Sequence, residues 1–527
     1  MRDLFARSKN PLTVLIIVAY LVMGILYAVK TPPWQVPDEP AHYNYIKYLV
    51  ENYRFPVLEM GDYPHDYLEE IKDKRFPPEM SIEPIRYEFH QPPLYYILAT
   101  VVYKLFAGRL LPLRLLSVLL GCCLLWVAYH VAKEIFPRDE ALALGTTAFV
   151  AFAPMHIAMT AAVNNDTLAE LILAGILWML VRYVREGAEG TETRFLESSV
   201  PQTRPMASTF DAPGNTGEWK NLVSPFIGLG VLMGLGLLTK ITTLVAIPLA
   251  LVAVIFREGW LEQGQKSSFT RRFLLLASCL LLPALFLALP WFVRNASVYG
   301  GLDIWGLQRH DAIVVGQPRT AEWLAQLGAT GLAKEFILTT FKSFWAQFGW
   351  MGILVDQRIY LILALLCAVV GLGLVLFVIR NVRQRALTSS QRMALGILAL
   401  SALFTLLSHL WYNLKFVQHQ GRYLFPALIP IGLAFALGLR EVLTRDNAKA
   451  AVLLFLAGIL ILAGKGLVTG DFNKLSISLL GGVAVAFGIK ALLPQKYDDL
   501  VFALPYLGLL GLDLICLFKF IVPYFQS

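Results

Sequence analysis

Long apolar segments alternate with shorter polar ones along almost the whole chain. Most of them have the length of about 20 residues that a helix needs to cross the hydrocarbon core of a bilayer. About thirteen segments meet this condition, at residues 11–29, 110–130, 141–160, 167–184, 222–239, 241–256, 273–292, 359–379, 393–412, 423–440, 450–468, 476–493 and 500–523. The pattern predicts an all-α polytopic membrane protein.

Two further apolar stretches, residues 93–107 and 336–354, carry charged and aromatic side chains. Such segments favour helices that lie in the membrane interface. With both treated as interfacial, the short basic loops fall on the side of the N-terminus, and Lys and Arg are enriched in cytoplasmic loops. We therefore predict a multi-pass protein of the cell membrane with a cytoplasmic N-terminus.

This topology assigns the longer polar segments to two sides of the membrane. Residues 31–109 form a long first external loop with juxtamembrane helices, and residues 293–358 form a second external loop. Residues 186–221, rich in Gly, Pro, Ser and Thr, are interpreted as a cytoplasmic linker. Residues 1–440 are then the membrane-embedded core, and residues 441–527 supply C-terminal transmembrane helices.

Composition supports the membrane assignment and limits the kinds of partner that are expected. Hydrophobic residues make up 57% of the 527 residues and charged residues only 16%, which excludes an ordinary soluble enzyme. The net charge of +8 is explained by basic cytoplasmic loops, so the expected surroundings are membrane lipids and no nucleic acid is expected. The five cysteines lie in apolar runs without CxxC spacing, which predicts neither a disulfide framework nor a zinc site.

The first unusual motif, Pro37–Tyr43, follows the first apolar segment within an acidic stretch. If a helix begins there, Asp38 and His42 are four residues apart and share one face. A carboxylate held at the membrane surface is suited to act as a general base. The alternative is that Asp38 only caps the helix that follows it.

Two more polar groups are predicted on the same external side. His90 precedes Pro92 and Pro93, where it could contact a phosphate or a hydroxyl group or simply be an interfacial residue. Asp166 lies in the Asn164–Thr167 turn between two apolar segments. It either caps the next helix or places a second carboxylate beside Asp38.

Three cations also fall at external helix ends: Lys240, Arg294 and Arg422. Arginine is suited to bidentate recognition of phosphate, and Arg422 lies where the dipole at a helix N-terminus favours an anion. The alternative is that these side chains anchor helices at the lipid headgroups.

External cations and external carboxylates together form a chemically coherent set. The cations could hold a lipid-linked phosphate while a carboxylate accepts a proton from an acceptor hydroxyl or amine. The sequence contains no GxxxxGK[ST] motif for a soluble nucleotide, which favours a donor embedded in the membrane. The remaining candidates for contact with donor or acceptor are His42, Tyr95, Asn165 and His419.

At these residues the chain resembles polytopic glycosyltransferases of the C-type fold, in the branch that contains protein O-mannosyltransferases and the lipid A aminoarabinose transferase. The resemblance covers roughly residues 11–440. Its features are Pro37-Asp38-Glu39-Pro40, Pro92-Pro93-Leu94-Tyr95-Tyr96, Arg114-Leu115-Leu116-Ser117, Asn165-Asp166, Gly236-Leu237-Leu238-Thr239-Lys240, Trp291 with Arg294, and Gly421-Arg422-Tyr423-Leu424-Phe425-Pro426.

The resemblance implies an enzyme that takes a sugar from a polyprenyl-phosphate or polyprenyl-diphosphate donor and transfers it with inversion at the extracytoplasmic face. It implies Asp38 as the base with Glu39 beside it, and Asp166 as a second external acid. Lys240, Arg294 and Arg422 would surround the lipid phosphate. The acceptor, whether protein, lipid or polysaccharide, stays open.

One position departs from the pattern, because some relatives have Glu-Lys where this chain has His90-Gln91. The lysine's contact with phosphate then falls to His90 or to the other cations. No cofactor is expected. A divalent ion is the less favoured alternative; its ligands would be Asp38, Glu39, His42, His90 and Asp166.

Two other functions compete with the enzyme. A transporter or flippase for a lipid-linked sugar would need ionisable groups near the membrane midplane and inverted repeats. Neither is evident in the sequence, where the charges lie at the ends of apolar segments. A non-catalytic scaffold would leave the external acids and cations without a shared purpose.

Overall fold

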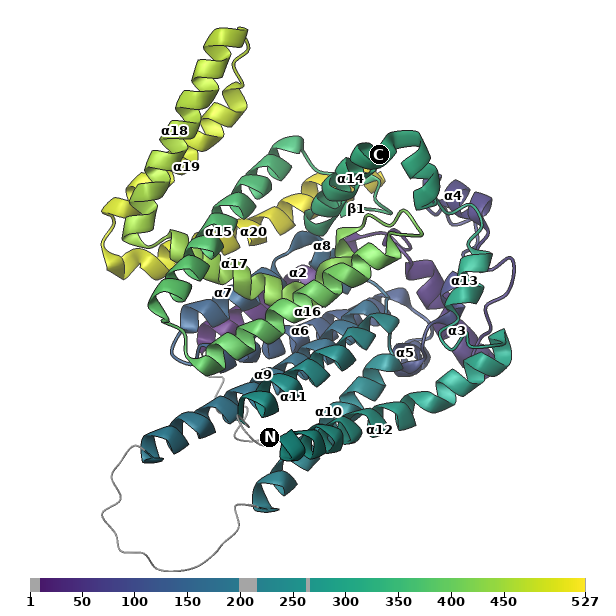
Figure 1. The fold of residues 1–527 in the computed structure, drawn as a ribbon. Helices are drawn as coiled ribbons and strands as arrows, with labels where there is room; N and C mark the ends of the chain where they lie inside the picture. Colours follow the sequence, from purple (N-terminus) through teal and green to yellow (C-terminus); the bar gives the residue numbers. More distant parts are fainter. Residues whose placement is uncertain (1–9, 199–215, 262–265, 527) are drawn as a thin grey trace, which may run out of the picture.

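The computed structural model describes residues 10–198, 216–261 and 266–526. They form a bundle of long helices, with shorter helices and loops gathered at one end (Figure 1). The helices of the bundle are α2 (Pro11–Lys30), α6 (Leu110–Ile135), α7 (Glu140–Ala151), α9 (Asp166–Ser198), α10 (Thr216–Leu237), α11 (Ala246–Leu261), α12 (Lys266–Tyr299), α15 (Gln357–Gln384), α16 (Ser389–Tyr412), α17 (Leu428–Val442), α18 (Arg445–Thr469), α19 (Lys474–Leu492) and α20 (Asp498–Ile515).

The shorter elements connect these helices. They are α3 (Glu39–Asn52), α4 (His65–Asp73), η1 (Tyr87–His90), α5 (Leu94–Leu105), α8 (Pro154–Thr160), η2 (Ile241–Val245), α13 (Leu307–Ile313), α14 (Thr320–Trp345), β1 (Gln347–Phe348), β2 (Ile353–Leu354), η3 (Gly421–Ala427), η4 (Gln495–Tyr497), η5 (Cys516–Ile521) and α21 (Val522–Gln526). β1 and β2 pair antiparallel. The all-α polytopic fold class is confirmed.

The predicted count of thirteen transmembrane helices is not reproduced. Within the described ranges, 11 helices are long and apolar enough to cross a membrane, or 12 if the pair α7 and α8 counts as one span. This pair covers the predicted span 141–160 and bends by 62°, because Pro154 cannot continue the backbone hydrogen bonds of α7. The predicted span 222–239 corresponds to the shorter apolar helix Val223–Leu237.

Three loop predictions have different outcomes. Residues 93–107 form α5, whose 12 residues are too few to span the bilayer and fit an interfacial helix. The stretch 336–354 is not one helix, because α14 ends at Trp345 and a β-hairpin follows. Of the predicted linker 186–221, residues 199–215 lie outside the described ranges, and α9 and α10 extend into it from both sides.

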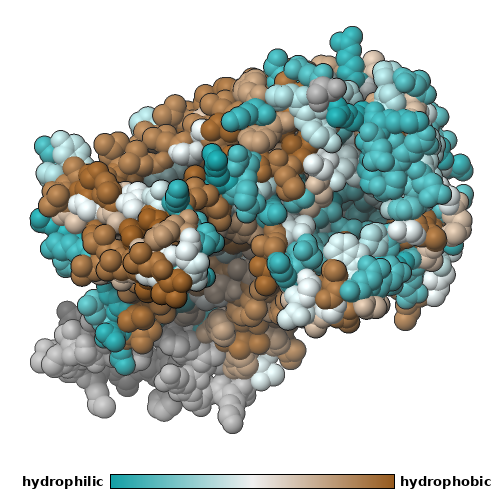
Figure 2. All heavy atoms as spheres, turned by 90° about the horizontal axis from the view of Figure 1, so that it is seen from above, coloured by the Kyte–Doolittle hydropathy of each residue, from teal (hydrophilic) through white to brown (hydrophobic). Residues whose placement is uncertain are grey.

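Polar and apolar side chains are separated on the surface. Polar residues gather at the end of the molecule that carries α3, α4 and α13, and apolar residues cover much of the rest of the visible face (Figure 2). Large apolar side chains of the long helices are exposed, such as Leu282, Phe286 and Leu460. A membrane is the environment in which a surface of this kind is stable.

The C-terminal helices divide between two apolar clusters. Phe502 and Tyr506 of α20 belong to the main core, whereas Phe455 and Phe487 of α18 and α19 form a separate small cluster. In Figure 1, α18 and α19 form a hairpin that projects from the bundle. η5 and α21 return to the end of the molecule where α2 stops.

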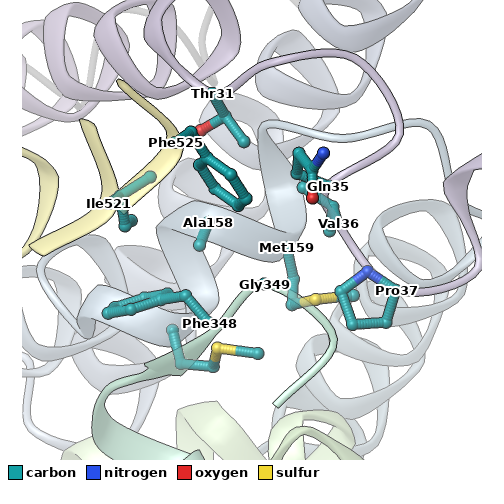
Figure 3. A pocket seen from close by; sticks show the side chains of 11 residues that line it. Thr31, Gln35, Val36, Pro37, Ala158, Met159, Phe348, Gly349, Ile521 and Phe525 are labelled. Carbon is teal, nitrogen blue, oxygen red and sulfur yellow. The ribbon is translucent and has the colours of Figure 1, made fainter. Parts of the chain in front are cut away.

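A pocket lies between these last residues and the segment that follows α2. It has about 300 Å³ of empty volume, and its lining is mostly apolar. Met159 of α8, Phe348 of β1 and Phe525 of α21 line it, with Gln35 and Pro37 at one side (Figure 3). The short segment that carries Asp38 therefore has an apolar pocket at its edge.

Candidate active site

Asp38 occupies a strained position between α2 and α3. Its φ is 68°, in the left-handed region, and its side chain makes no cap hydrogen bond to α3. A non-glycine residue in this region costs folding free energy, and such residues cluster at functional sites. The alternative interpretation of Asp38 as a helix cap is therefore excluded.

The Asp38 carboxylate is instead bound by two side chains from distant parts of the chain. The Tyr87 hydroxyl donates to Oδ1 over 2.7 Å, and Arg422 donates from its guanidinium to Oδ2 over 2.6 Å. The side chain of Asp38 is 21% exposed and that of Arg422 is 8% exposed. Burial alone would raise the pKa of Asp38, but Arg422, His42 and the Tyr87 hydroxyl together lower this pKa to about 2. Asp38 is thus ionised at neutral pH.

Asp166 and Lys240 form a second acid–cation pair, with 2.5 Å between Oδ1 and Nζ. Asn164 caps α9 by accepting from the backbone N–H groups of Asp166 and Thr167, so the Asp166 side chain is not needed as a cap. Arg422 also acts electrostatically on Asp166. The two pairs therefore belong to one site, which we call the paired site: Asp38, Arg422, Asp166 and Lys240.

Glu39 lies beside Asp38 in the chain but in a closed environment. It is 0% exposed, and its two oxygens accept from Arg114 Nε and Nη2 over 2.8 and 2.6 Å. The backbone N–H groups of Trp34 and Val163 also donate to it. All the hydrogen bonds that Glu39 accepts come from the protein, which fits a role in holding the turn that carries Asp38.

Arg114 completes the network around Glu39. Its remaining N–H groups donate to the backbone carbonyls of Ala28, Thr31 and Pro32. A single buried side chain on α6 thus ties the end of α2 to the start of α3 and fixes the turn on which Asp38 lies. We call Glu39 and Arg114 the buried pair.

His42 and His90 are both buried near the paired site. The Nδ1 of His42 lies 2.8 Å from the Tyr96 hydroxyl. Burial lowers the pKa of His42, although the carboxylates of Glu88 and Asp38 act to raise it. His90 contacts the Tyr87 carbonyl through Nδ1. Its ring lies 4.7 Å from that of His310, and burial together with His310 lowers its pKa.

The structure does not bring every candidate into the paired site. Arg294 donates to Asn295 and to the Pro56 carbonyl and lies over the Trp291 ring. His419 packs its ring against Phe336.

Tyr95 and Asn165 have internal partners. The Tyr95 hydroxyl lies 3.2 Å from Ser117 Oγ. Asn165 donates to Gln91 Oε1 and to the Thr239 carbonyl, so it joins the segments that carry His90 and Lys240.

Three contributors to the site were not predicted from the sequence: Tyr87, Glu88 and the role of Arg114. An arginine inside an apolar helix is a detectable signal, because a charge at membrane depth needs a partner. Tyr87 and Glu88 have no comparable local signal. Within the described part of the chain, no group of three or more His, Cys, Asp or Glu side chains is placed to hold a metal ion.

One protein family and several solved structures are similar to this chain. Residues 90–191 match the family described as dolichyl-phosphate-mannose-protein mannosyltransferase. The crystal structure of ArnT from Cupriavidus metallidurans bound to undecaprenyl phosphate is similar, with a TM-score of 0.50, 14% sequence identity, and coverage of 97% of this chain and 77% of that chain. A search of curated proteins by sequence finds no match.

Two further solved structures are similar at lower TM-scores. The apo state of the same ArnT gives 0.49, with 14% identity over 96% of this chain and 76% of that chain. The Archaeoglobus fulgidus oligosaccharyltransferase in complex with Zn and sulfate gives 0.44, with 14% identity over 92% and 57%.

The family match and the ArnT-like fold confirm the resemblance to C-type polytopic glycosyltransferases. They indicate a membrane glycosyltransferase.

Proposed function

We propose that this chain transfers a glycosyl group from a polyprenyl-phosphate-linked donor to an acceptor at the extracytoplasmic face of the membrane. The observation that carries the proposal is the paired site, where two carboxylates and two cations from four separate segments meet. The undecaprenyl phosphate bound to the similarly folded ArnT supports a donor of the same chemical class.

The cations of the paired site are suited to hold the donor phosphate. Arg422 and Lys240 now pair with carboxylates, and an incoming phosphate offers the same type of oxygen acceptor. When the phosphate takes over hydrogen bonds from Arg422, Asp38 loses the charge that lowers its pKa most. Donor binding therefore makes Asp38 a stronger base.

Asp38 then acts as the general base in a direct displacement. The acceptor oxygen or nitrogen bonds to the anomeric carbon as the bond from that carbon to the phosphate oxygen breaks. The acceptor proton passes to Asp38, and the leaving phosphate keeps the electron pair while Arg422 and Lys240 stabilise its charge. A single displacement inverts the configuration at the anomeric carbon.

The position of the site along the bundle supports the extracytoplasmic assignment. The 20 residues of α2 span about 30 Å, and the paired site follows its C-terminal end. The opposite end of the bundle carries Arg257, Arg380 and Arg440, which lie near the C-terminal ends of α11, α15 and α17. Positive charge on cytoplasmic loops puts the paired site on the other side.

Mass spectrometry of lipids that co-purify with the full-length chain tests this proposal. We expect a polyprenyl phosphate, with or without a sugar, to be retained by the wild type and lost from the Arg422→Gln, Lys240→Met double variant. Retention of only ordinary phospholipids by both proteins would contradict the assignment of the donor class.

A further inference from the structure

Glu88 is a buried carboxylate, and one of its two oxygens has no hydrogen-bond donor in the described part of the chain. It lies in η1, is 9% exposed, and its Oε2 has no hydrogen-bond partner within the described ranges. A buried carboxylate normally receives hydrogen bonds or pairs with a cation, because removing its charge from water costs free energy. The unpaired Oε2 is therefore a position where a ligand can supply the missing donor.

Glu88 adjoins the paired site through its neighbour in the chain. It follows Tyr87, which binds Asp38. Burial lowers the pKa of His42, and among the charges that oppose this, Glu88 is the largest contributor. Burial lowers the pKa of Lys240, but the negative charges of Asp166 and Glu88 raise it, and the net pKa is raised. Both effects indicate that the Glu88 carboxylate lies near His42 and Lys240.

The hydrogen bonds that the two cations make go to other carboxylates. Lys240 is bound to Asp166 and Arg422 to Asp38, so neither neutralises Glu88 through a hydrogen bond. A carboxylate oxygen such as Glu88 Oε2 can accept a hydrogen bond. A donor on the ligand, such as a hydroxyl group, can therefore complete Glu88.

A glycosyl donor presents such groups at the required place. Its sugar ring is bonded directly to a phosphate oxygen, so the ring hydroxyls lie within a few bonds of the phosphate. We propose that Glu88 binds hydroxyl groups of the donor sugar while Lys240 and Arg422 bind the phosphate. This inference rests on the proposed function and assigns a sugar-binding residue to the same site.

Binding measurements on the full-length chain in nanodiscs separate sugar recognition from phosphate recognition. The probes are undecaprenyl phosphate alone and undecaprenyl phosphate that carries a hexose, a pentose or an amino sugar. No acceptor is present, so contact with the acceptor cannot contribute. The variant is Glu88→Gln, and the matched control is Glu83→Gln, since Glu83 is exposed and paired with Lys47 on the same external segment.

We expect at least one glycosylated probe to bind the wild type and Glu83→Gln more tightly than the naked carrier. Glu88→Gln should weaken that binding by about tenfold, as expected for a lost charge-assisted hydrogen bond, and leave affinity for the naked carrier unchanged. The variant should also melt at the same temperature as the wild type or higher, because an unpaired buried charge has been removed.

Each other result identifies which idea fails. No gain in affinity from any sugar, or equal loss for naked and glycosylated probes, overturns the role of Glu88. A lower melting temperature of Glu88→Gln with unchanged sugar binding makes Glu88 a structural residue. If the wild type binds neither the naked nor any glycosylated carrier, the proposed function itself is wrong.

Discussion

Asp38 and Glu39 are neighbours in the chain and each binds an arginine, yet their surroundings differ. The buried pair of Glu39 and Arg114 is closed, and every hydrogen bond of the two side chains goes to the protein. In the paired site, Asp38 remains partly exposed, and Arg422 Nε is buried without a partner in the described ranges.

This difference separates a structural ion pair from one that can exchange partners. A closed pair gains nothing from a ligand, because each donor and acceptor is already satisfied. An open pair has free hydrogen-bonding capacity and lies where a ligand can reach it. The buried pair therefore ties the turn to α6, and the paired site is the part that we propose binds the donor.

The largest expected effect comes from breaking the buried pair. Arg114→Met leaves Glu39 as an unpaired buried charge and removes the hydrogen bonds to Ala28, Thr31 and Pro32. We expect a loss of about 3–5 kcal/mol in stability, seen as a large fall in melting temperature or in the yield of folded protein.

The double variant Glu39→Gln, Arg114→Met controls for the unpaired charge. It should be more stable than Arg114→Met alone, because no charge is left without a partner. Equal stability of Arg114→Met and the wild type would contradict the structural role of the pair.

A smaller change in free energy is expected when a cation of the paired site is removed. Arg422→Gln removes a charged donor to phosphate, worth about 1.5–3 kcal/mol, so affinity for undecaprenyl phosphate should fall roughly 10- to 150-fold. Isothermal titration calorimetry in nanodiscs measures this change.

Arg294→Gln provides the matched control, since Arg294 is engaged with Asn295 and Pro56 away from the pair. Its affinity for undecaprenyl phosphate should change by less than about twofold, because its guanidinium donates to Asn295 and to the Pro56 carbonyl and not to a carboxylate of the paired site. An equal loss in both variants would show that the phosphate lies elsewhere.

Much of the architecture was predictable because membrane helices leave a strong linear signal. The apolar runs located the spans, and the aromatic and charged residues of 93–107 indicated a helix too polar to cross the bilayer. The bend at Pro154 and the hairpin after Trp345 were missed, since both interrupt runs that remain apolar. The hydropathy of a segment indicates whether it can be buried in lipid, but it does not show where the helix bends or ends.

The four residues of the paired site were candidates from the sequence, but their pairing was not predicted. Asp38, Asp166, Lys240 and Arg422 were all candidates, and their separation into two pairs came only from the fold. Asp38 and Arg422 are 384 residues apart, so no local pattern connects them. Asp38 and Glu39 are adjacent acidic residues, and nothing in the sequence shows which of them binds Arg114. In the structure Arg114 binds Glu39, and Asp38 is left to bind Arg422.

The measurement closest to the central claim compares Asp38→Asn with the wild type in two assays on the same membranes. One assay follows conversion of the glycosylated carrier to free polyprenyl phosphate, and the other follows binding of undecaprenyl phosphate. We expect a loss of about 10²–10⁴-fold in conversion, while binding stays at least as tight because Arg422 is no longer paired with a carboxylate. Wild-type conversion by Asp38→Asn would contradict this expectation.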